Sequence, residues 1–285
     1  MEFVTTTHLG FYVDYIDSLT EVMLSAIDMG SYGVLFQLGN NRNQTRKRIV
    51  LDDLMSCSQL LVRFPLTIFS IIPSRYNLCG DSKYLAWNGN ELQDAKTIHI
   101  VREIEYELSA LAEIQGRTIV ELGSYRDKNA GIRATIGSLN HISFKPSYGL
   151  VLTNSLDQYH NIGVTLDDLY SVYDLLDKDI KPYTTICIHI AYLFVNGLYD
   201  IRNKQDIDRF FNDYTAIFDK VKMVSILLTD TTTSWQSKEY IEVPIGQGVI
   251  WNDSDIIYTW LDMCKEKDIM VLTKYVQDID VILNL

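Results

Sequence analysis

Eight short apolar runs alternate with longer segments whose apolar residues recur at helical spacing, and this alternation restricts the fold more than any other feature. The apolar runs are nearly continuous, which indicates burial on both faces, as in a parallel sheet covered by helices. The expected strands are residues 3–13, 32–38, 66–72, 117–123, 148–154, 184–190, 222–229 and 268–274. The clearest helical segments are residues 17–30, 51–64, 95–116, 165–179 and 206–221.

Eight such strands in 285 residues predict a single domain, residues 1–285, with the α/β class (β/α)8 TIM-barrel fold. A doubly wound sheet is the alternative, but no Gly-x-Gly-x-x-Gly pattern opens a helix after the first strand. No repeat or Pro/Gly/Ser-rich linker divides the chain. In a barrel, functional side chains lie at the carboxyl ends of the strands, so these ends are where a site is expected.

Composition indicates an intracellular, cytoplasmic protein with no membrane insertion. No apolar run is long enough to cross a bilayer, and the first residues lack the pattern of a signal peptide. The four cysteines are scattered, as expected for reduced, buried thiols. The formal net charge is −12, which is unusual for a protein whose main task is to bind a phosphate backbone.

Several segments resemble the endonuclease IV family, in the order in which that family has them. They are "GSYGVLFQLGNNRNQ", "ELGSYRDKNAGIRATIGSLN", "GLVLTNSLDQYHNIGVTLDDLYSVYDLLD", "ICIHIAYLFVNGLYDIRNKQDIDRFFNDY" and "LLTDTTTSWQSKEYIEVPIGQG". The resemblance implies a TIM barrel of the endonuclease IV-like and xylose isomerase-like type. It also implies a zinc-dependent apurinic/apyrimidinic endonuclease, in which three zinc ions are held by nine His, Asp and Glu side chains at the strand ends.

The positions that correspond to those nine ligands have lost the residue types of the family. By alignment of the motifs they are Ile71 (or the adjacent Ile72), Glu121, Thr153, His189, Tyr192, Leu227, Tyr240, Glu242 and Thr273. Zinc is bound by ionised carboxylates, thiolates and neutral imidazoles, so most of these side chains are unsuited to it. The sequence therefore predicts no metal, no cofactor, no catalytic residue of the family type and no AP endonuclease activity.

The alternative to a lost metal site is a metal site with a new set of ligands. Glu121, His189 and Glu242 would form a one-metal hydrolase or a sugar isomerase-like enzyme if they converged on a single ion. A strand-end histidine that bonds to the backbone or to Tyr192, together with two solvated carboxylates, is the simpler interpretation.

Residual nucleic-acid contact is a second alternative. The segment "NNRNQTRKR" after the second strand matches a loop that contacts DNA in the family, and Arg75 and Tyr76 follow the third strand at another such place. Arginine and lysine there would contact phosphates. The candidate nucleic-acid-binding residues are Asn41, Arg42, Arg46, Lys47, Arg48, Arg75 and Tyr76.

The sequence thus predicts a catalytically inactive endonuclease IV-like homologue that acts as a structural, scaffold or protein-interaction component. Large DNA viruses such as poxviruses carry homologues of this family. We therefore expect a viral, virion-associated pseudoenzyme with a protein partner, and the sequence does not specify the oligomeric state.

Overall fold

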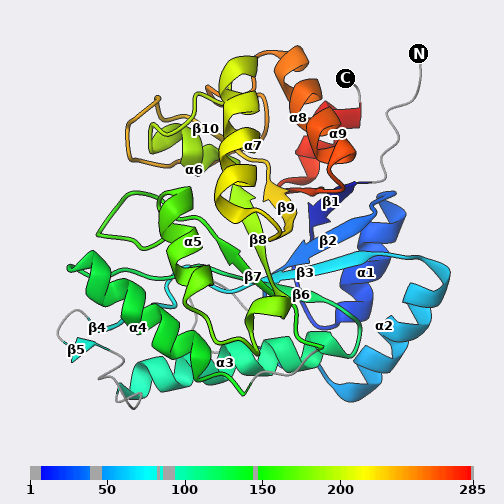
Figure 1. The fold of residues 1–285 in the computed structure, drawn as a ribbon. Coiled ribbons are helices and arrows are strands. Elements are labelled where there is room, and N and C mark those ends of the chain that lie inside the picture. Colours follow the sequence, from blue (N-terminus) through cyan, green and yellow to red (C-terminus); the bar gives the residue numbers. More distant parts are fainter. Residues whose placement is uncertain (1–7, 39–46, 82–83, 86–93, 144–146, 284–285) are drawn as a thin grey trace.

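Eight parallel strands close into a barrel in the computed structural model, which describes residues 8–38, 47–81, 84–85, 94–143 and 147–283 (Figure 1). Around the barrel the strands follow one another in chain order, and the last pairs with the first. They are β1 (Leu9–Tyr12), β2 (Gly33–Phe36), β3 (Thr67–Ile71), β6 (Arg117–Val120), β7 (Leu150–Thr153), β8 (Thr184–His189), β9 (Met223–Leu227) and β12 (Met270–Thr273). The predicted TIM-barrel fold is confirmed.

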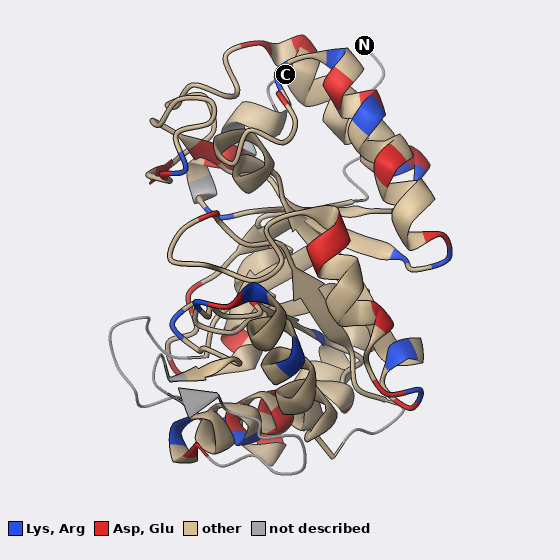
Figure 2. Cartoon of the chain, turned by 60° about the vertical axis from the view of Figure 1, so that its left-hand side comes forward, with Lys and Arg blue, Asp and Glu red and all other residues tan. Residues whose placement is uncertain are grey.

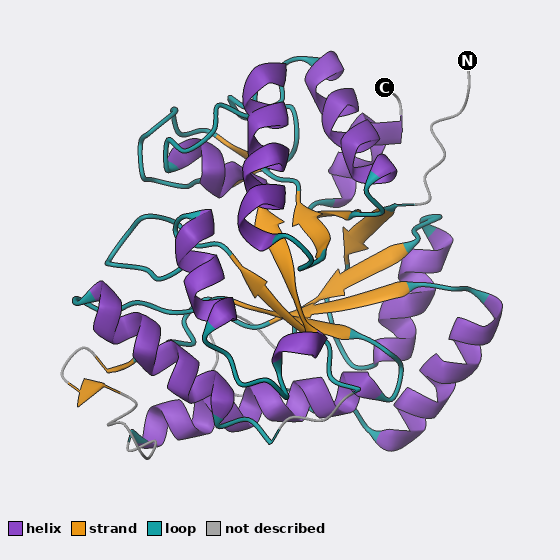
Figure 3. Cartoon of the chain, viewed as in Figure 1, coloured by secondary structure: helices purple, strands orange, loops and turns teal. Residues whose placement is uncertain are grey.

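Helices surround the strands on the outside, as Figure 3 shows. They are α1 (Leu19–Asp28), α2 (Leu51–Arg63), α3 (Ala95–Ala112), α4 (Lys128–Asn140), α5 (Leu166–Asp174), α6 (Ile190–Val195), α7 (Lys204–Phe218), α8 (Ser254–Glu266) and α9 (Val276–Leu283). A 3-10 turn, η1 (Lys181–Tyr183), precedes β8. Two antiparallel pairs lie outside the barrel: β4 (Gly80–Asp81) with β5 (Tyr84–Leu85), and β10 (Asp230–Thr231) with β11 (Glu242–Val243).

The core has two layers because successive strand side chains point to opposite faces. On β2, Leu35 belongs to the cluster inside the barrel, whereas Val34 and Phe36 pack against α1, α2 and α3. On β3, Phe69 points inward and Ile68 outward. The buried residues of the inner cluster are Leu35, Phe69, Ile119, Val151, Cys187, Val224, Leu227, Met270 and Leu272. The barrel is therefore filled by its own side chains.

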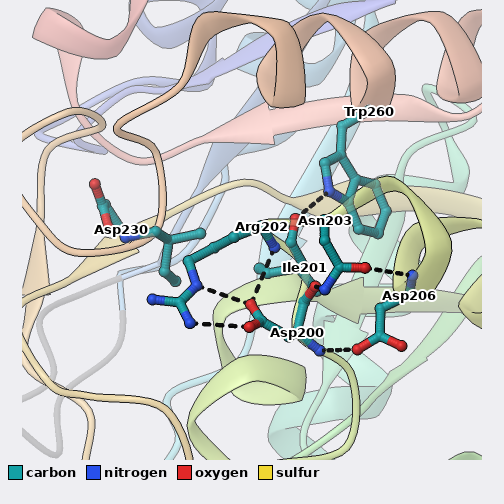
Figure 4. A network of polar contacts seen from close by, with 8 residues as sticks. Asp200, Ile201, Arg202, Asn203, Asp206, Asp230 and Trp260 are labelled. Atoms are coloured by element: carbon teal, nitrogen blue, oxygen red, sulfur yellow. Dashed lines mark hydrogen bonds and ion pairs between the residues drawn. The ribbon is translucent and has the colours of Figure 1, made fainter.

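Polar side chains fix the ends of the helices. Thr165 and Asp168 form a reciprocal capping box at the start of α5, and Asn203 caps α7 by accepting from the Asp206 amide at 2.8 Å. In the turn before α7, Asp200 accepts from the Nε and Nη2 of Arg202 at 2.8 and 2.9 Å (Figure 4). These contacts account for the positions at which α5 and α7 begin.

The described part of the chain includes no helix that is both long enough and apolar enough to cross a bilayer.

Candidate active site at the barrel mouth

The carboxyl ends of the strands gather the nine positions that the family resemblance assigns to zinc ligands. Five of them are the last residues of their strands: Ile71, Thr153, His189, Leu227 and Thr273. Glu121 directly follows β6, and Tyr192 lies in the first turn of α6. Glu242 begins β11, and Tyr240 lies two residues before it. The barrel topology thus brings all nine positions to one end of the fold.

An aromatic cluster occupies one side of this end. The rings of His189 and Tyr192 stack with their centroids 3.7 Å apart and their planes 4° apart. Tyr240 packs edge-on against both rings, at 5.2 and 5.1 Å, and donates a hydrogen bond to Thr229 Oγ1 at 2.8 Å. The Asn154 side chain fixes the backbone of His189, because it accepts from the amide at 2.6 Å and donates to the carbonyl at 3.2 Å.

Burial keeps the aromatic cluster uncharged at neutral pH. It lowers the pKa of His189 well below its usual value, and the charge of Lys274 lowers this pKa further. Burial also raises the pKa of Tyr192, and the carboxylates of Glu121 and Glu242 add to that rise. The imidazole is therefore neutral and the phenol protonated. Nδ1 of His189 finds no hydrogen-bond partner among the described residues.

A charged group lies beside the aromatic cluster. Lys274 Nζ is 2.7 Å from Glu242 Oε2, and the two side chains are 38% and 16% exposed. Glu121 is partly buried, and desolvation raises its pKa to about 7, although the nearby Lys274 charge lowers it. These groups face a cavity of about 320 Å³, lined by Tyr12, Gln37, Ile71, Ile72, Ser74, Glu121, Tyr192, Glu242, Lys274 and Tyr275.

The residues at the mouth do not fit a zinc cluster. Ile71 and Leu227 offer no donor atom, and Thr153 and Thr273 offer only neutral hydroxyls. One face of the His189 ring is covered by Tyr192. Across the described ranges, no three His, Cys, Asp or Glu side chains lie close enough together to hold a metal ion. In particular, Glu121, His189 and Glu242 do not form such a group.

Sequence reasoning missed five residues that line the cavity. They are Tyr12, Gln37, Ser74, Lys274 and Tyr275. Four of them are the last residue of a barrel strand or lie one or two positions beyond it, and Ser74 follows the end of β3 by three residues. Their position at or shortly after the end of a strand is the sequence feature that could have identified them. Lys274 is the most important of them, because among the described residues it supplies the only positive charge that lines this cavity.

A buried carboxylate organises the loop that follows β11. Asp230 accepts from the backbone amides of Thr231, Gly246, Gly248 and Ile250 at 2.8 to 3.1 Å. A side chain at residue 248 would collide with this carboxylate and with the Thr231 carbonyl oxygen, so only glycine fits there. The segment "IGQG" is therefore a structural element, shaped around Asp230.

The described part of the basic segment is engaged within the protein. Lys47 pairs with Asp17 at 3.3 Å, and Arg48 pairs with Glu103 at 2.5 Å while its guanidinium lies 4.0 Å from the centre of the Tyr106 ring. Asn41, Arg42 and Arg46 lie outside the described residues.

The two other candidate nucleic-acid contacts lie after β3. Tyr76 is only 7% exposed and packs in the core, so its ring face is not offered to a base. The Arg75 guanidinium lies 6.0 Å from the centre of that ring. Of the described candidates, Lys47 and Arg48 are therefore ion-paired, and Tyr76 is buried in the core.

Comparison with known proteins finds similarity to endonuclease IV. No protein family model matches the chain. "Probable endonuclease 4" of Chlorobium limicola is 29% identical over 100 residues, which make up 35% of this chain and 33% of that protein. The match therefore spans about a third of the length of this curated relative.

Solved structures match over almost the whole chain. Endonuclease IV from Thermus thermophilus has a TM-score of 0.77 at 13% identity, covering 97% of this chain and 96% of that one. The structure of AsfvAP:AG has a TM-score of 0.75 at 12% identity, covering 98% and 96%. A xylose isomerase domain-containing protein from Salmonella typhimurium LT2 has a TM-score of 0.58 at 7% identity, covering 100% and 97%. The chain thus resembles the endonuclease IV family in sequence over about a third of its length, and it has an endonuclease IV-like barrel fold throughout.

Proposed function

We propose that this chain is a degenerate member of the endonuclease IV family that does not cleave abasic DNA and acts as a structural or protein-interaction component. The observation that carries the proposal is the content of the barrel mouth. A neutral His189–Tyr192 stack and a Lys274–Glu242 ion pair lie where the family resemblance implies zinc ligands. The Lys274 ammonium, 2.7 Å from the carboxylate of Glu242, would repel a dication bound there.

The charges of the described residues argue against a basic surface that binds DNA. The described basic residues Lys47 and Arg48 are paired with Asp17 and Glu103. Figure 2 shows blue and red residues interspersed along the helices, with no single basic face among the described residues in that view. All four cysteines are buried and free, which fits the reducing, intracellular setting that we propose. A viral, virion-associated role rests on the family resemblance alone and is proposed on that ground.

The test is cleavage of a fluorescently labelled duplex that carries one abasic-site analogue, with and without added Zn²⁺ or Mn²⁺. We expect no cleavage above the buffer rate, while an active endonuclease IV assayed in parallel cleaves the same duplex. Cleavage that disappears in Glu121→Gln would overturn the proposal. Fluorescence anisotropy on the same duplex, with Arg42, Arg46, Lys47 and Arg48 neutralised together, tests the nucleic-acid-binding alternative.

A second candidate is an enzyme of altered, metal-independent chemistry. The cavity of about 320 Å³ favours it, because a carboxyl group whose pKa is about 7 lies there beside a lysine and a tyrosine. Such a carboxyl can both give and take a proton near neutral pH. In this reading Glu121 is the acid/base group, and Tyr192 and Lys274 orient the substrate. Any activity found should be lost in Glu121→Gln.

A further inference from the structure

Helix α2 presents an apolar face to solvent. Its opposite face carries Leu54 and Cys57 into the core between the barrel and the helices. On the outer face, the side chains of Leu51, Met55 and Val62 are 69%, 56% and 87% exposed. Solvent-facing positions of a barrel helix are ordinarily polar, so three large apolar side chains in line need an explanation.

The three side chains form one stripe along the helix. At 3.6 residues per turn, positions 51, 55 and 62 fall within about 40° of one another, and Ser58 lies on the same face. The pattern is also nearly symmetric when the helix is reversed. A rotation of 180° about a line perpendicular to the helix axis, passing between residues 56 and 57, interchanges the position of Leu51 with that of Val62. It also interchanges the position of Met55 with that of Ser58. A second α2 in antiparallel orientation would therefore meet the stripe with its own equivalent residues.

The charges of α2 are arranged in the same way. Asp53 is already used within the fold, because it accepts from the Leu19 amide at 2.6 Å and the Thr20 amide at 3.0 Å. That leaves Asp52 near the start of the helix and Arg63 at its end, both exposed. The structure gives neither side chain an ion-pair partner in the described ranges. Eleven residues separate them, so they lie along the same edge of the stripe, at opposite ends.

We propose that the α2 face binds a second copy of this chain, with the two α2 helices antiparallel across a two-fold axis. The axis passes between the helices near residues 56 and 57. Leu51 of one copy then packs beside Val62 of the other, and the two Met55 side chains lie near the centre. Because a two-fold axis perpendicular to the plane of the helices keeps both charged edges on the same side, Asp52 of each copy faces Arg63 of the other.

The neighbouring surface can enlarge this contact. The helix is about 20 Å long, which alone is too little for a stable dimer that buries about 800 Å² per partner. Val50 and Phe64, at the two ends of α2, are 62% and 44% exposed, and Leu24 on the adjacent α1 is 42% exposed. A groove of about 500 Å³ next to Val62 is lined in part by Pro65, Leu66 and Ile114.

This inference deepens the proposed function and rests on it, because it names the partner of an interaction protein. The two proposals are tested by different assays. Cleavage of abasic DNA would contradict the proposed function, whereas a chain that stays monomeric would contradict the proposed dimer.

The experiment measures the molar mass of the full chain by sedimentation equilibrium between about 1 and 100 µM. We expect a monomer–dimer equilibrium that Met55→Glu weakens by at least about tenfold, as expected when a central apolar side chain of an interface is replaced by a charge. Leu175→Glu is the matched control: Leu175 is also 56% exposed but lies at the end of α5, so its substitution should leave the equilibrium unchanged. Thermal melts show that each variant is folded.

Charge reversal tests the antiparallel arrangement directly. Asp52→Arg and Arg63→Asp should each weaken the dimer, because they place like charges at both ends of the contact. The double variant Asp52→Arg/Arg63→Asp should restore it. A wild-type chain that is monomeric throughout, a dimer insensitive to Met55→Glu, or a double variant no better than the single ones would each overturn the proposal.

Discussion

Glu121 shows how much depends on the surroundings of a single side chain at the barrel mouth. The sequence places it directly after β6, in the position of a family zinc ligand, and that much follows from strand order alone. The pKa of Glu121 at this position could not be predicted from the sequence. The pKa of Glu121 is raised to about 7 by burial against the cavity wall, and Lys274, from the opposite side of the barrel, limits that rise. Desolvation depends on packing between distant segments, which residue spacing does not report.

We predict that Glu121 makes the folded chain less stable as the pH rises. Its pKa is about 7 in the folded chain and near 4.5 when unfolded, so the folded state binds more protons between these values. The folded chain therefore loses stability as the pH rises from about 4.5 through 7. Glu121→Gln should remove this loss. The free energy of unfolding of the variant, relative to that of wild type, should therefore rise by about 2 kcal/mol from pH 5 to pH 8. Urea unfolding at four pH values measures it, and parallel stability curves would contradict the assignment.

The positions of the strands and helices could be predicted from the sequence better than the contacts of their side chains. All eight barrel strands fall within the expected ranges, because buried parallel strands read as continuous apolar runs. Four of the five expected helical segments contain α1, α2, α3 and α5, although α5 ends at Asp174, before the expected residue 179. The fifth, residues 206–221, overlaps α7, which begins two residues earlier, at Lys204. The β10–β11 pair was not anticipated. It lies beside contacts made only in the folded chain, such as those of Asp230 with its loop, which leave no periodic signal.

We predict that the loop containing Gly246, Gly248 and Ile250 becomes disordered when the Asp230 carboxylate is removed. Asp230→Ala removes the acceptor for four backbone amides and should lower the free energy of unfolding by about 2 to 4 kcal/mol. Asp208→Asn, on the exposed side of α7, is the control and should change stability by less than about 0.5 kcal/mol. Hydrogen exchange should show lost protection at Gly246, Gly248 and Ile250. Unchanged protection there would show that the loop is held by other contacts.

At the scale of the whole molecule, the barrel holds together through its apolar core, and its mouth carries polar groups that balance one another. The inner cluster fills the barrel below the mouth, and a larger cluster joins the strands to most of the outer helices. The sequence could predict this architecture because it depends on the number and periodicity of apolar runs. Alignment of motifs alone was enough to assign nine positions to the zinc ligands that the family resemblance implies. The sequence could not predict the aromatic stack or the Lys274–Glu242 pair that occupy the same space, since these depend on side-chain geometry.

The last prediction follows from the side chains that line the barrel mouth, which include a lysine paired with a glutamate. A metal ion that bound the folded chain with a dissociation constant of about 1 µM would stabilise it by about 2.7 kcal/mol at about 100 µM metal. We expect Zn²⁺ and Mn²⁺ at that concentration to leave the melting temperature unchanged, and EDTA to leave it unchanged as well. Mass spectrometry of the purified protein should find no stoichiometric metal. A metal-dependent rise that His189→Ala abolishes would show that the mouth binds a metal after all. That substitution removes the one imidazole among the nine positions that the family resemblance assigns to zinc ligands, while Lys274 and Glu242 remain.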